Sequence, residues 1–150
     1  MDTDITTLKL VFKLMPEIDH TFFAGYFKDF HVVDNLNKTH IKTLMAIKFE
    51  GPLPMSHISQ KLSLEKGSFT PVAKKLIKLG YIKKVQSEED RRISLLSLTD
   101  EGRIFTNRLH EGHLTYLENQ FNKLTKEEHD IFESAIKTVF ESVEKINERD

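Results

Sequence analysis

Apolar side chains recur at helical spacing over the first third of the chain. Between residues 5 and 30 they are separated by three or four positions, which predicts a helix with one apolar face. Pro16 interrupts this run, so the helix is expected either to kink there or to start afresh with Pro16 in its first turn. A second helix is predicted over about 38–49, with Asn37 or Thr39 as its N-cap.

The pattern becomes more broken between residues 51 and 67. The stretch 51–54, Gly-Pro-Leu-Pro, predicts a short extended segment that could add a third strand to a small sheet, at its edge because proline cannot donate a ladder hydrogen bond. A short helix is predicted from near Ser56, with Ile58 and Leu62 on its apolar side. The residues Glu65-Lys66-Gly67 then predict a turn.

The next segment predicts an amphipathic helix that carries most of the local positive charge. Proline is tolerated only in the first turn of a helix, so Pro71 places the start at Gly67 or Ser68. Gly80 follows the last periodic residues, where a left-handed C-terminal cap favours glycine. The apolar face is formed by Phe69, Val72 and Leu76, and the other faces carry Thr70, Pro71, Lys74, Lys75 and Lys78.

Two short apolar segments then flank a charged loop. Residues 82–85 and 93–98 are rich in β-branched and other apolar side chains, which predicts a two-stranded hairpin. Its tip reads Ser87-Glu88-Glu89-Asp90-Arg91-Arg92. A short helix that braces a cationic second helix, followed by a hairpin with two arginines at its tip, is an arrangement suited to the phosphates and grooves of DNA.

Two long helices are predicted after the hairpin. Thr99 is the expected N-cap of the first, which continues to Leu124 and in which Gly112 allows a bend. Thr125 and Glu128 match a capping box that restarts the last helix. In that helix the apolar residues step by four, three, four and three positions, which predicts a coiled-coil-like seam. The seam comprises Phe132, Ile136, Val139, Val143 and Ile146, widened by Phe140.

Charge is distributed unevenly, although the net charge of the 150 residues is only −1. Residues 51–92 carry nine basic and four acidic side chains, whereas residues 1–35 carry three and six and residues 124–150 carry four and eight. The near-neutral total therefore does not argue against DNA binding, because positive charge is concentrated on the predicted basic helix and hairpin.

Composition excludes several other kinds of site. The chain has no cysteine, which excludes disulfides, thiolate metal sites and cysteine-based nucleophiles or sensors. It has no phosphate-binding glycine loop and no nucleophile or zinc-protease motif, so we expect no enzyme and no cofactor. The acidic start does not resemble a secretion signal, and no run approaches the ~20 apolar residues of a membrane span, so a cytoplasmic location is expected.

The central motifs, taken together, resemble the MarR family of bacterial transcriptional regulators. They are Thr70-x5-Leu76-x3-Gly80, then Asp90-Arg91-Arg92, then Leu98-Thr99-Asp100-Glu101-Gly102, in that order. The resemblance implies a mainly α (α+β) winged helix-turn-helix in one domain over residues 1–150. It implies a DNA-binding lobe over about 36–99, and a dimerisation lobe formed by about 1–35 and 100–150.

The resemblance also implies a function. The implied function is sequence-specific regulation of transcription. The protein would bind an inverted-repeat operator in double-stranded DNA as a homodimer and act as a repressor that a small-molecule effector relieves. Arg92 resembles the wing arginine that enters the minor groove, with Asp90 orienting the loop. The implied DNA-binding residues are Ser68, Thr70, Pro71, Lys74, Lys75, Asp90, Arg91 and Arg92.

Other interpretations remain open on the sequence alone. The winged helix could bind a protein partner, with an incidental basic helix, and the terminal helices could form an ordinary intrachain hairpin. His110 and His113, one helical turn apart, could begin the site of a metal-responsive regulator with a third ligand from His20, His31 or Glu118, although exposed histidines are the simpler interpretation. The aromatic residues Phe23, Phe27, Phe49 and Tyr116 could line an effector pocket or simply belong to the core.

Overall fold

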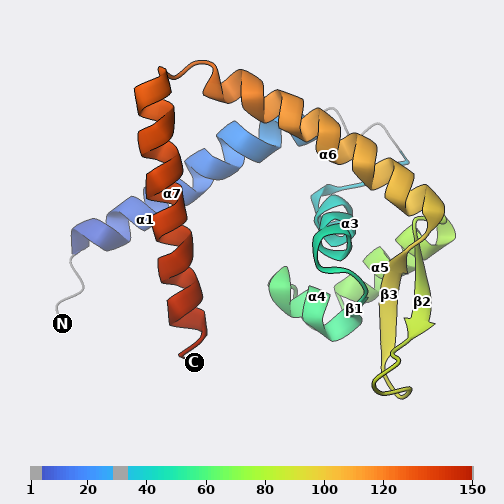
Figure 1. Cartoon of the computed structure of the whole chain (residues 1–150). Helices are drawn as coiled ribbons and strands as arrows, with labels where there is room; N and C mark the ends of the chain where they lie inside the picture. Colours follow the sequence, from blue (N-terminus) through green and yellow to red (C-terminus); the bar gives the residue numbers. More distant parts are fainter. Residues whose placement is uncertain (1–4, 29–33, 150) are drawn as a thin grey trace. The chain divides into compact units, whose positions relative to one another are not determined.

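The structure is a computed structural model, and it describes residues 5–28 and 34–149 (Figure 1). Its helices are α1 (Ile5–Asp19), α2 (Gly25–Phe27), α3 (Lys38–Glu50), α4 (Met55–Lys61), α5 (Phe69–Lys78), α6 (Asp100–Phe121) and α7 (Lys126–Asn147). Its strands are β1 (Leu53–Pro54), β2 (Ile82–Gln86) and β3 (Ser94–Leu98). The predicted mainly α winged-helix class is confirmed. None of the described helices is long and apolar enough to cross a membrane.

The chain forms two compact units, Met1–His113 and Leu114–Asp150, and the boundary falls within α6. The first unit contains the three-stranded antiparallel sheet in the order β1-β3-β2. Leu53 pairs with Leu96 and Pro54 with Leu95, so the predicted third strand is present. Pro54 lies in an edge strand of two residues, where its missing N–H group costs little.

One apolar core fixes the helices of the first unit against this sheet. Its most buried side chains come from several different elements, and each contributes roughly 1.5–3 kcal/mol by leaving water. Leu44 of α3, Ile58 of α4, Leu76 of α5 and Leu96 of β3 are all fully buried. Burial of Leu76 in this core holds α5 in the first unit.

The N-terminal helix excludes one of the two alternatives that Pro16 suggested. Pro16 lies inside α1, so the helix does not start afresh there. Instead a π-helical turn (η1, His20–Ala24) begins four residues later and joins α1 to α2. Such turns are a recognised cause of irregularity in a helix. Phe30 and His31, which the sequence placed in or beside this helix, lie outside the described residues.

Three predicted helix boundaries are confirmed by their caps. Asn37, rather than Thr39, caps α3. Thr99 Oγ1 accepts the N–H of Gly102 at 3.0 Å, and Thr125 forms the predicted capping box with Glu128. The sequence was wrong about the end of α6, which stops at Phe121 because residues 122–124 form a turn.

Gly112 lies inside α6, which runs without interruption from Asp100 to Phe121. An added Cβ there would lie 2.4 Å from Tyr26 Oη, which donates a hydrogen bond to the carbonyl of Leu109 at 2.8 Å. Glycine at this position makes room for the tyrosine.

Gly102 is required by a close approach of α6 to the start of β2. An added Cβ would lie 2.0 Å from the carbonyl oxygen of Tyr81, and this oxygen also accepts the N–H of Thr99 at 3.0 Å.

We expect Gly102→Ala to lower the free energy of unfolding by about 2 kcal/mol. The added methyl group would overpack this contact at a cost of up to about 3 kcal/mol, which exceeds the roughly 1 kcal/mol that alanine gains over glycine in helix propensity. Urea unfolding measures the change. If Gly102→Ala unfolds at the same urea concentration as the wild type, this packing is contradicted. Glu101→Ala, a substitution at an exposed neighbouring position of the same helix, serves as the control.

His40 should make stability depend on pH. Its Nδ1 accepts the N–H of Asn37 at 3.1 Å, and the N–H of His40 donates to Asn37 Oδ1 at 3.1 Å. Burial, followed by the positive charge of Lys75, lowers the pKa of His40. Below about pH 6.5, His40 therefore takes up a proton more readily in the unfolded chain than in the folded chain. As a result, the free energy of unfolding falls as the pH falls.

The variant His40→Gln keeps a side-chain acceptor at this position of the capping box but cannot titrate. Urea unfolding at pH 7.5 and pH 5.5 should show a smaller loss of stability in the variant than in the wild type. Equal losses in the two proteins would exclude His40 as a source of the pH dependence.

Candidate nucleic-acid interface

Helix α5 separates a buried apolar face from an exposed polar one. Phe69, Val72 and Leu76 are buried, as the periodicity predicted, and Ala73 is buried as well. The helix begins at Phe69 with Ser68 as its N-cap, so Pro71 falls in the first turn, where its missing N–H group has no helical partner to lose. The exposed polar side is formed by Ser68, Thr70, Pro71, Lys74 and Lys78.

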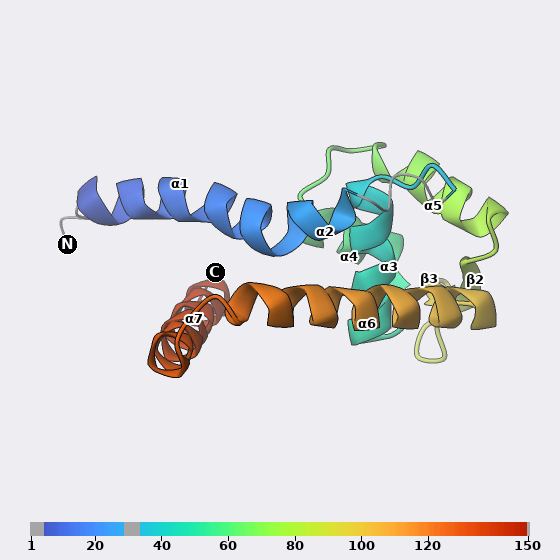
Figure 2. The ribbon, with the colours of Figure 1, turned by 90° about the horizontal axis from the view of Figure 1, so that it is seen from above.

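The end of α5 leads directly into the hairpin. Gly80 has φ +80°, and its N–H donates to the carbonyl of Ile77 at 3.0 Å. The N–H of Tyr81 donates to the carbonyl of Leu76 at 3.0 Å, which completes a Schellman motif. The predicted glycine cap is confirmed. Because the chain reverses within this motif, β2 lies beside α5 (Figures 1 and 2).

The hairpin tip presents an oriented arginine. The Arg92 guanidinium donates from Nε to Asp90 Oδ1 at 3.1 Å and from Nη2 to Asp90 Oδ2 at 3.0 Å. The side chain of Arg92 is nevertheless 90% exposed. These side-chain bonds, together with the backbone N–H of Arg92, lower the pKa of Asp90, so the carboxylate stays charged and holds the arginine in one orientation.

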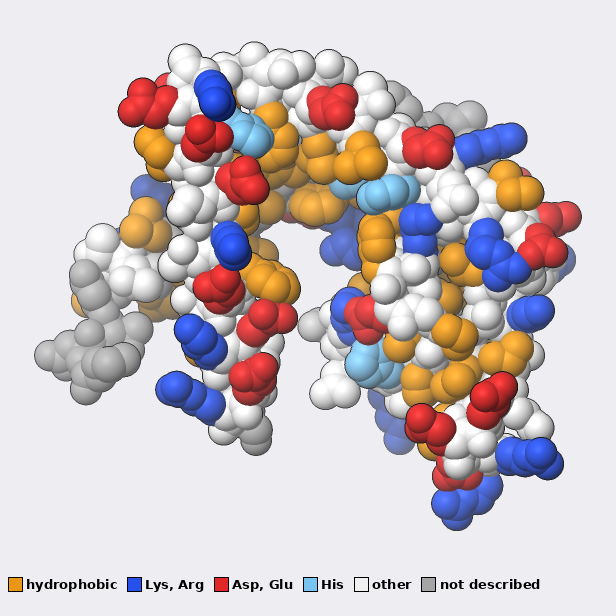
Figure 3. Space-filling model, in the orientation of Figure 1, with side chains coloured by type: hydrophobic (Ala, Val, Ile, Leu, Met, Phe, Trp, Pro, Cys, Tyr) orange, Lys and Arg blue, Asp and Glu red, His pale blue; other side chains and the backbone are white. Residues whose placement is uncertain are grey.

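The rest of the tip mixes both signs of charge, as the space-filling view shows at the end of the hairpin (Figure 3). Arg91 is exposed beside Arg92, and Glu88 and Glu89 are exposed on the other side of Asp90. The tip is closed by the N–H of Ser87, which donates to the carbonyl of Ile93 at 3.0 Å. Ile93, predicted as the first residue of the second strand, therefore belongs to the loop.

Lys75 has a different environment from the other lysines of α5. It is half-buried, and its Nζ donates to the backbone carbonyl of Asn35 at 2.5 Å. Lys74 and Lys78 are both exposed. The sequence grouped Lys75 with Lys74, because helical spacing alone does not reveal a partner 40 residues away.

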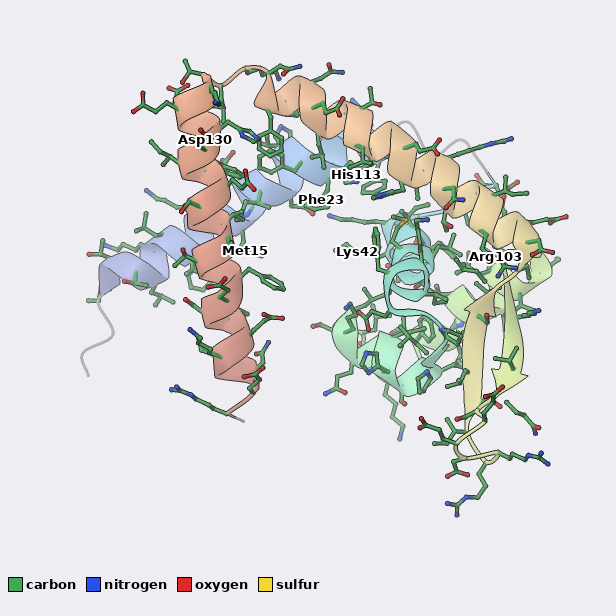
Figure 4. All side chains as sticks on the ribbon, in the orientation of Figure 1. Met15, Phe23, Lys42, Arg103, His113 and Asp130 are labelled. Atoms are coloured by element: carbon green, nitrogen blue, oxygen red, sulfur yellow. The ribbon has the colours of Figure 1, made fainter. Side chains whose placement is uncertain are left out.

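Two of the four aromatic residues named for an effector pocket lie together: the rings of Phe23 and Phe27 stack with centroids 6.4 Å apart, and both pack on His113. Phe27 lines a cavity of about 350 Å³ between α2 and α3, whose other lining residues include His20, Lys28, Leu36 and Lys38. Phe23 packs on His113 at 5.3 Å between ring centroids, and Figure 4 shows the two side by side. Phe49 is exposed on α3 and contacts His110, whereas Tyr116 belongs to the second unit.

The histidine pair on α6 is used in packing. His113 Nε2 donates to the carbonyl of Phe22 in η1 at 2.6 Å, and its ring stacks on Tyr26 with centroids 4.9 Å apart. Within residues 5–28 and 34–149, no three His, Cys, Asp or Glu side chains are grouped so that they could hold a metal ion. Of the suggested third ligands, His31 lies outside the described residues, His20 lines the cavity, and Glu118 belongs to the second unit.

Sequence reasoning missed two residues that contact this region. Asp34 and Asn35 form a turn that meets Tyr81 and Lys75. An Asp-Asn pair after an apolar run is a turn signal, but it carries no information about its distant partners.

Comparisons with known proteins agree with this geometry. Residues 36–94 match the MarR family. The chain is 38% identical to the HTH-type transcriptional regulator PapX of Escherichia coli over 93 residues, which is 62% of this chain and 57% of that protein. It thus spans little more than half the length of PapX.

Two further proteins resemble the chain over more of their length. The HTH-type transcriptional regulator SarZ of Staphylococcus aureus is 31% identical over 109 residues, which is 73% of this chain and 70% of SarZ. The crystal structure of Streptococcus pneumoniae FabT in complex with DNA superposes with a TM-score of 0.72 at 20% identity, covering 93% of this chain and 99% of that one. The latter match shows a common fold.

Proposed function

The chain belongs to the MarR family of transcriptional regulators, and from this membership we propose that it binds double-stranded DNA in a sequence-specific manner through α5 and the hairpin tip. The observation that carries the proposal is that the exposed polar side of α5 and the oriented Arg92 belong to adjoining elements. A helix in the major groove with a hairpin arginine in the adjacent minor groove is a docking mode that this arrangement suits.

Individual side chains would have different tasks in this interface. Ser68, Thr70 and Pro71 lie in the first turn of α5, where short side chains can approach base edges. Lys74 and Arg91 would neutralise phosphates, which sets register and affinity but does not read sequence. Arg92 would enter the minor groove, and Asp90 would hold it in the orientation that the structure describes.

We propose that the protein is a homodimer, with one domain over residues 1–150. The DNA-binding lobe would cover about 36–99, and the dimerisation lobe about 1–35 and 100–150. Two apolar surfaces support this proposal because they are exposed in the single chain. On α1 the exposed residues are Ile5, Leu8, Leu10, Val11, Phe12, Leu14 and Met15; on α7 they are Ile136, Val139, Phe140, Val143 and Ile146.

A two-fold dimer would select an inverted repeat whose half-sites lie about one helical turn, ~10 bp, apart. Bound over a promoter, it would act as a repressor by excluding polymerase. A small-molecule effector would relieve repression if it preferred a dimer whose two α5 helices are wrongly spaced for DNA. The cavity beside Phe27 is a candidate site for such an effector, because Leu36 and Ile41 line it together with Lys28 and Lys38.

The proposal is tested by selecting bound duplexes from a random DNA pool with purified protein. The expected result is enrichment of an inverted repeat, bound with an affinity that falls steeply as salt rises, because bound phosphates release counterions. If the recovered sequences match the input pool, the proposal of sequence-specific binding fails. Weak binding with no salt dependence would favour the alternative of a protein-interaction module.

A further inference from the structure

Two side chains, one from α5 and one from the residue just before β2, reach the same short turn. Lys75 Nζ donates to the carbonyl oxygen of Asn35 at 2.5 Å, and Tyr81 Oη donates to Asp34 Oδ2 at 2.5 Å. The partners are separated by 40 and 47 residues in sequence. The turn formed by Asp34 and Asn35 thus contacts both α5, through Lys75, and the start of the hairpin, through Tyr81.

The turn is itself firmly held. Asp34 and Asn35 have φ of 55° and 52°, in the left-handed region that Asp and Asn tolerate better than most residues. The next residue, Leu36, is 2% exposed in the core, and Asn37 forms the capping box of α3. Because Leu36 and Asn37 fix the turn to the core and to α3, the turn can restrain the two side chains that it contacts, Lys75 and Tyr81.

Lys75 is directed away from the exposed side of α5. Successive residues of a helix are rotated by about 100°, so Lys75 cannot share the direction of Lys74. It lies instead at the border of the buried face, next to Val72 in the helical projection, and is half-buried where Lys74 is exposed. Its positive charge also reaches His40 of α3, whose pKa it helps to lower.

Tyr81 is held equally well. Its ring stacks on Phe105 of α6 with centroids 4.6 Å apart. Burial, the hydrogen bond to Asp34, and the charges of Asp34 and Glu101 raise its pKa to about 12. The phenol therefore remains protonated and continues to donate to Asp34 at any pH near neutrality.

We propose that the Asp34–Asn35 turn is a positioning element that sets the orientation of α5 and the hairpin, and that Lys75 and Tyr81 are positioning residues rather than DNA contacts. The inference rests on the proposed DNA-binding function, because orientation matters only if α5 and the tip must meet DNA together. It assigns to Lys75 a task different from that of the neighbouring Lys74.

The salt dependence of DNA binding separates the two tasks. Lys74→Met should make the slope of log K against log [salt] shallower by about 0.9, the value for one lost phosphate contact. Lys75→Met and Tyr81→Phe should weaken binding about five- to tenfold while leaving that slope unchanged, since each loses a charge-assisted hydrogen bond within the protein. A slope change in Lys75→Met equal to that in Lys74→Met would overturn the proposal.

The turn offers a matched pair of variants. Asn35→Gly keeps the backbone carbonyl that Lys75 uses and suits the positive φ, so DNA binding should match that of the wild type. Asp34→Gly also suits the positive φ but removes the carboxylate that Tyr81 uses, so it should weaken binding as Tyr81→Phe does. Equal binding by the two glycine variants would contradict a role for the Asp34 contact.

A measurement without DNA distinguishes failure of this inference from failure of the proposed function. Amide hydrogen exchange should be faster in α5 of Lys75→Met and Asp34→Gly than in the wild type or Lys74→Met, with unchanged exchange in α3 as evidence that the fold persists. Unchanged exchange in α5 would overturn the inference even if DNA binds. Faster exchange in a protein that binds no DNA would support the restraint and reject the function.

Discussion

Replacing Val143 by glutamate should convert the protein from a dimer to a monomer and lower its affinity for operator DNA at least about 100-fold. Val143 is 49% exposed in the single chain, on a stripe of α7 with Ile136, Val139, Phe140 and Ile146. In the proposed dimer a carboxylate there would be buried without a partner, which is strongly unfavourable. Loss of two-site binding removes a gain in affinity of about 10²–10⁴.

A control variant separates the effect of position from that of charge. Ser134→Glu adds the same side chain to the opposite face of α7, where it is exposed, and should leave both the dimer and DNA binding unchanged. Sedimentation equilibrium measures the oligomeric state, and fluorescence anisotropy with a labelled duplex measures affinity. A Val143→Glu protein that remains dimeric would exclude this stripe as the subunit interface.

Replacing Arg92 by alanine should weaken operator binding by about 1–3 kcal/mol, or roughly five- to 150-fold, while leaving the fold intact. The side chain is 90% exposed and its only described side-chain partner, Asp90, lies in the same loop, so folding depends little on it. The expected loss reflects a guanidinium that enters the narrow groove in a fixed orientation. Titrations at matched salt concentration measure it.

Lysine at position 92 is the informative comparison. Arg92→Lys keeps the charge but cannot form the two parallel bonds to Asp90, so it should recover only part of the lost affinity. Full recovery would mean that charge alone matters at this position. Wild-type affinity in Arg92→Ala would remove the hairpin tip from the DNA interface.

Sequence alone predicted the parts of the fold that local chemistry determines. Pro71 and Gly80 bracket α5 because one residue cannot donate inside a helix and the other permits a left-handed cap. Asn37 and Thr125 mark helix starts for the same kind of reason, since their side chains satisfy backbone N–H groups nearby. The two strands and the charged tip follow from alternation and turn residues between them.

The features that sequence did not predict depend on distant contacts. The π-helical turn at His20–Ala24 lies where Phe22 and Tyr26 meet α6, through His113 and Leu109. Lys75 looked like one more exposed cation because its partner, the Asn35 carbonyl, is 40 residues away. The packing of Gly112 against the side chain of Tyr26, 86 positions earlier in the sequence, was also not predicted.

In the proposed complex, DNA meets α5 and the hairpin tip. Amide hydrogen exchange with and without the selected duplex locates the bound surface, with a scrambled duplex as the control. We expect slower exchange in residues 68–74 and 87–93 with the selected duplex, and little change in α7. Protection confined to other surfaces, or equal protection by the scrambled duplex, would contradict it.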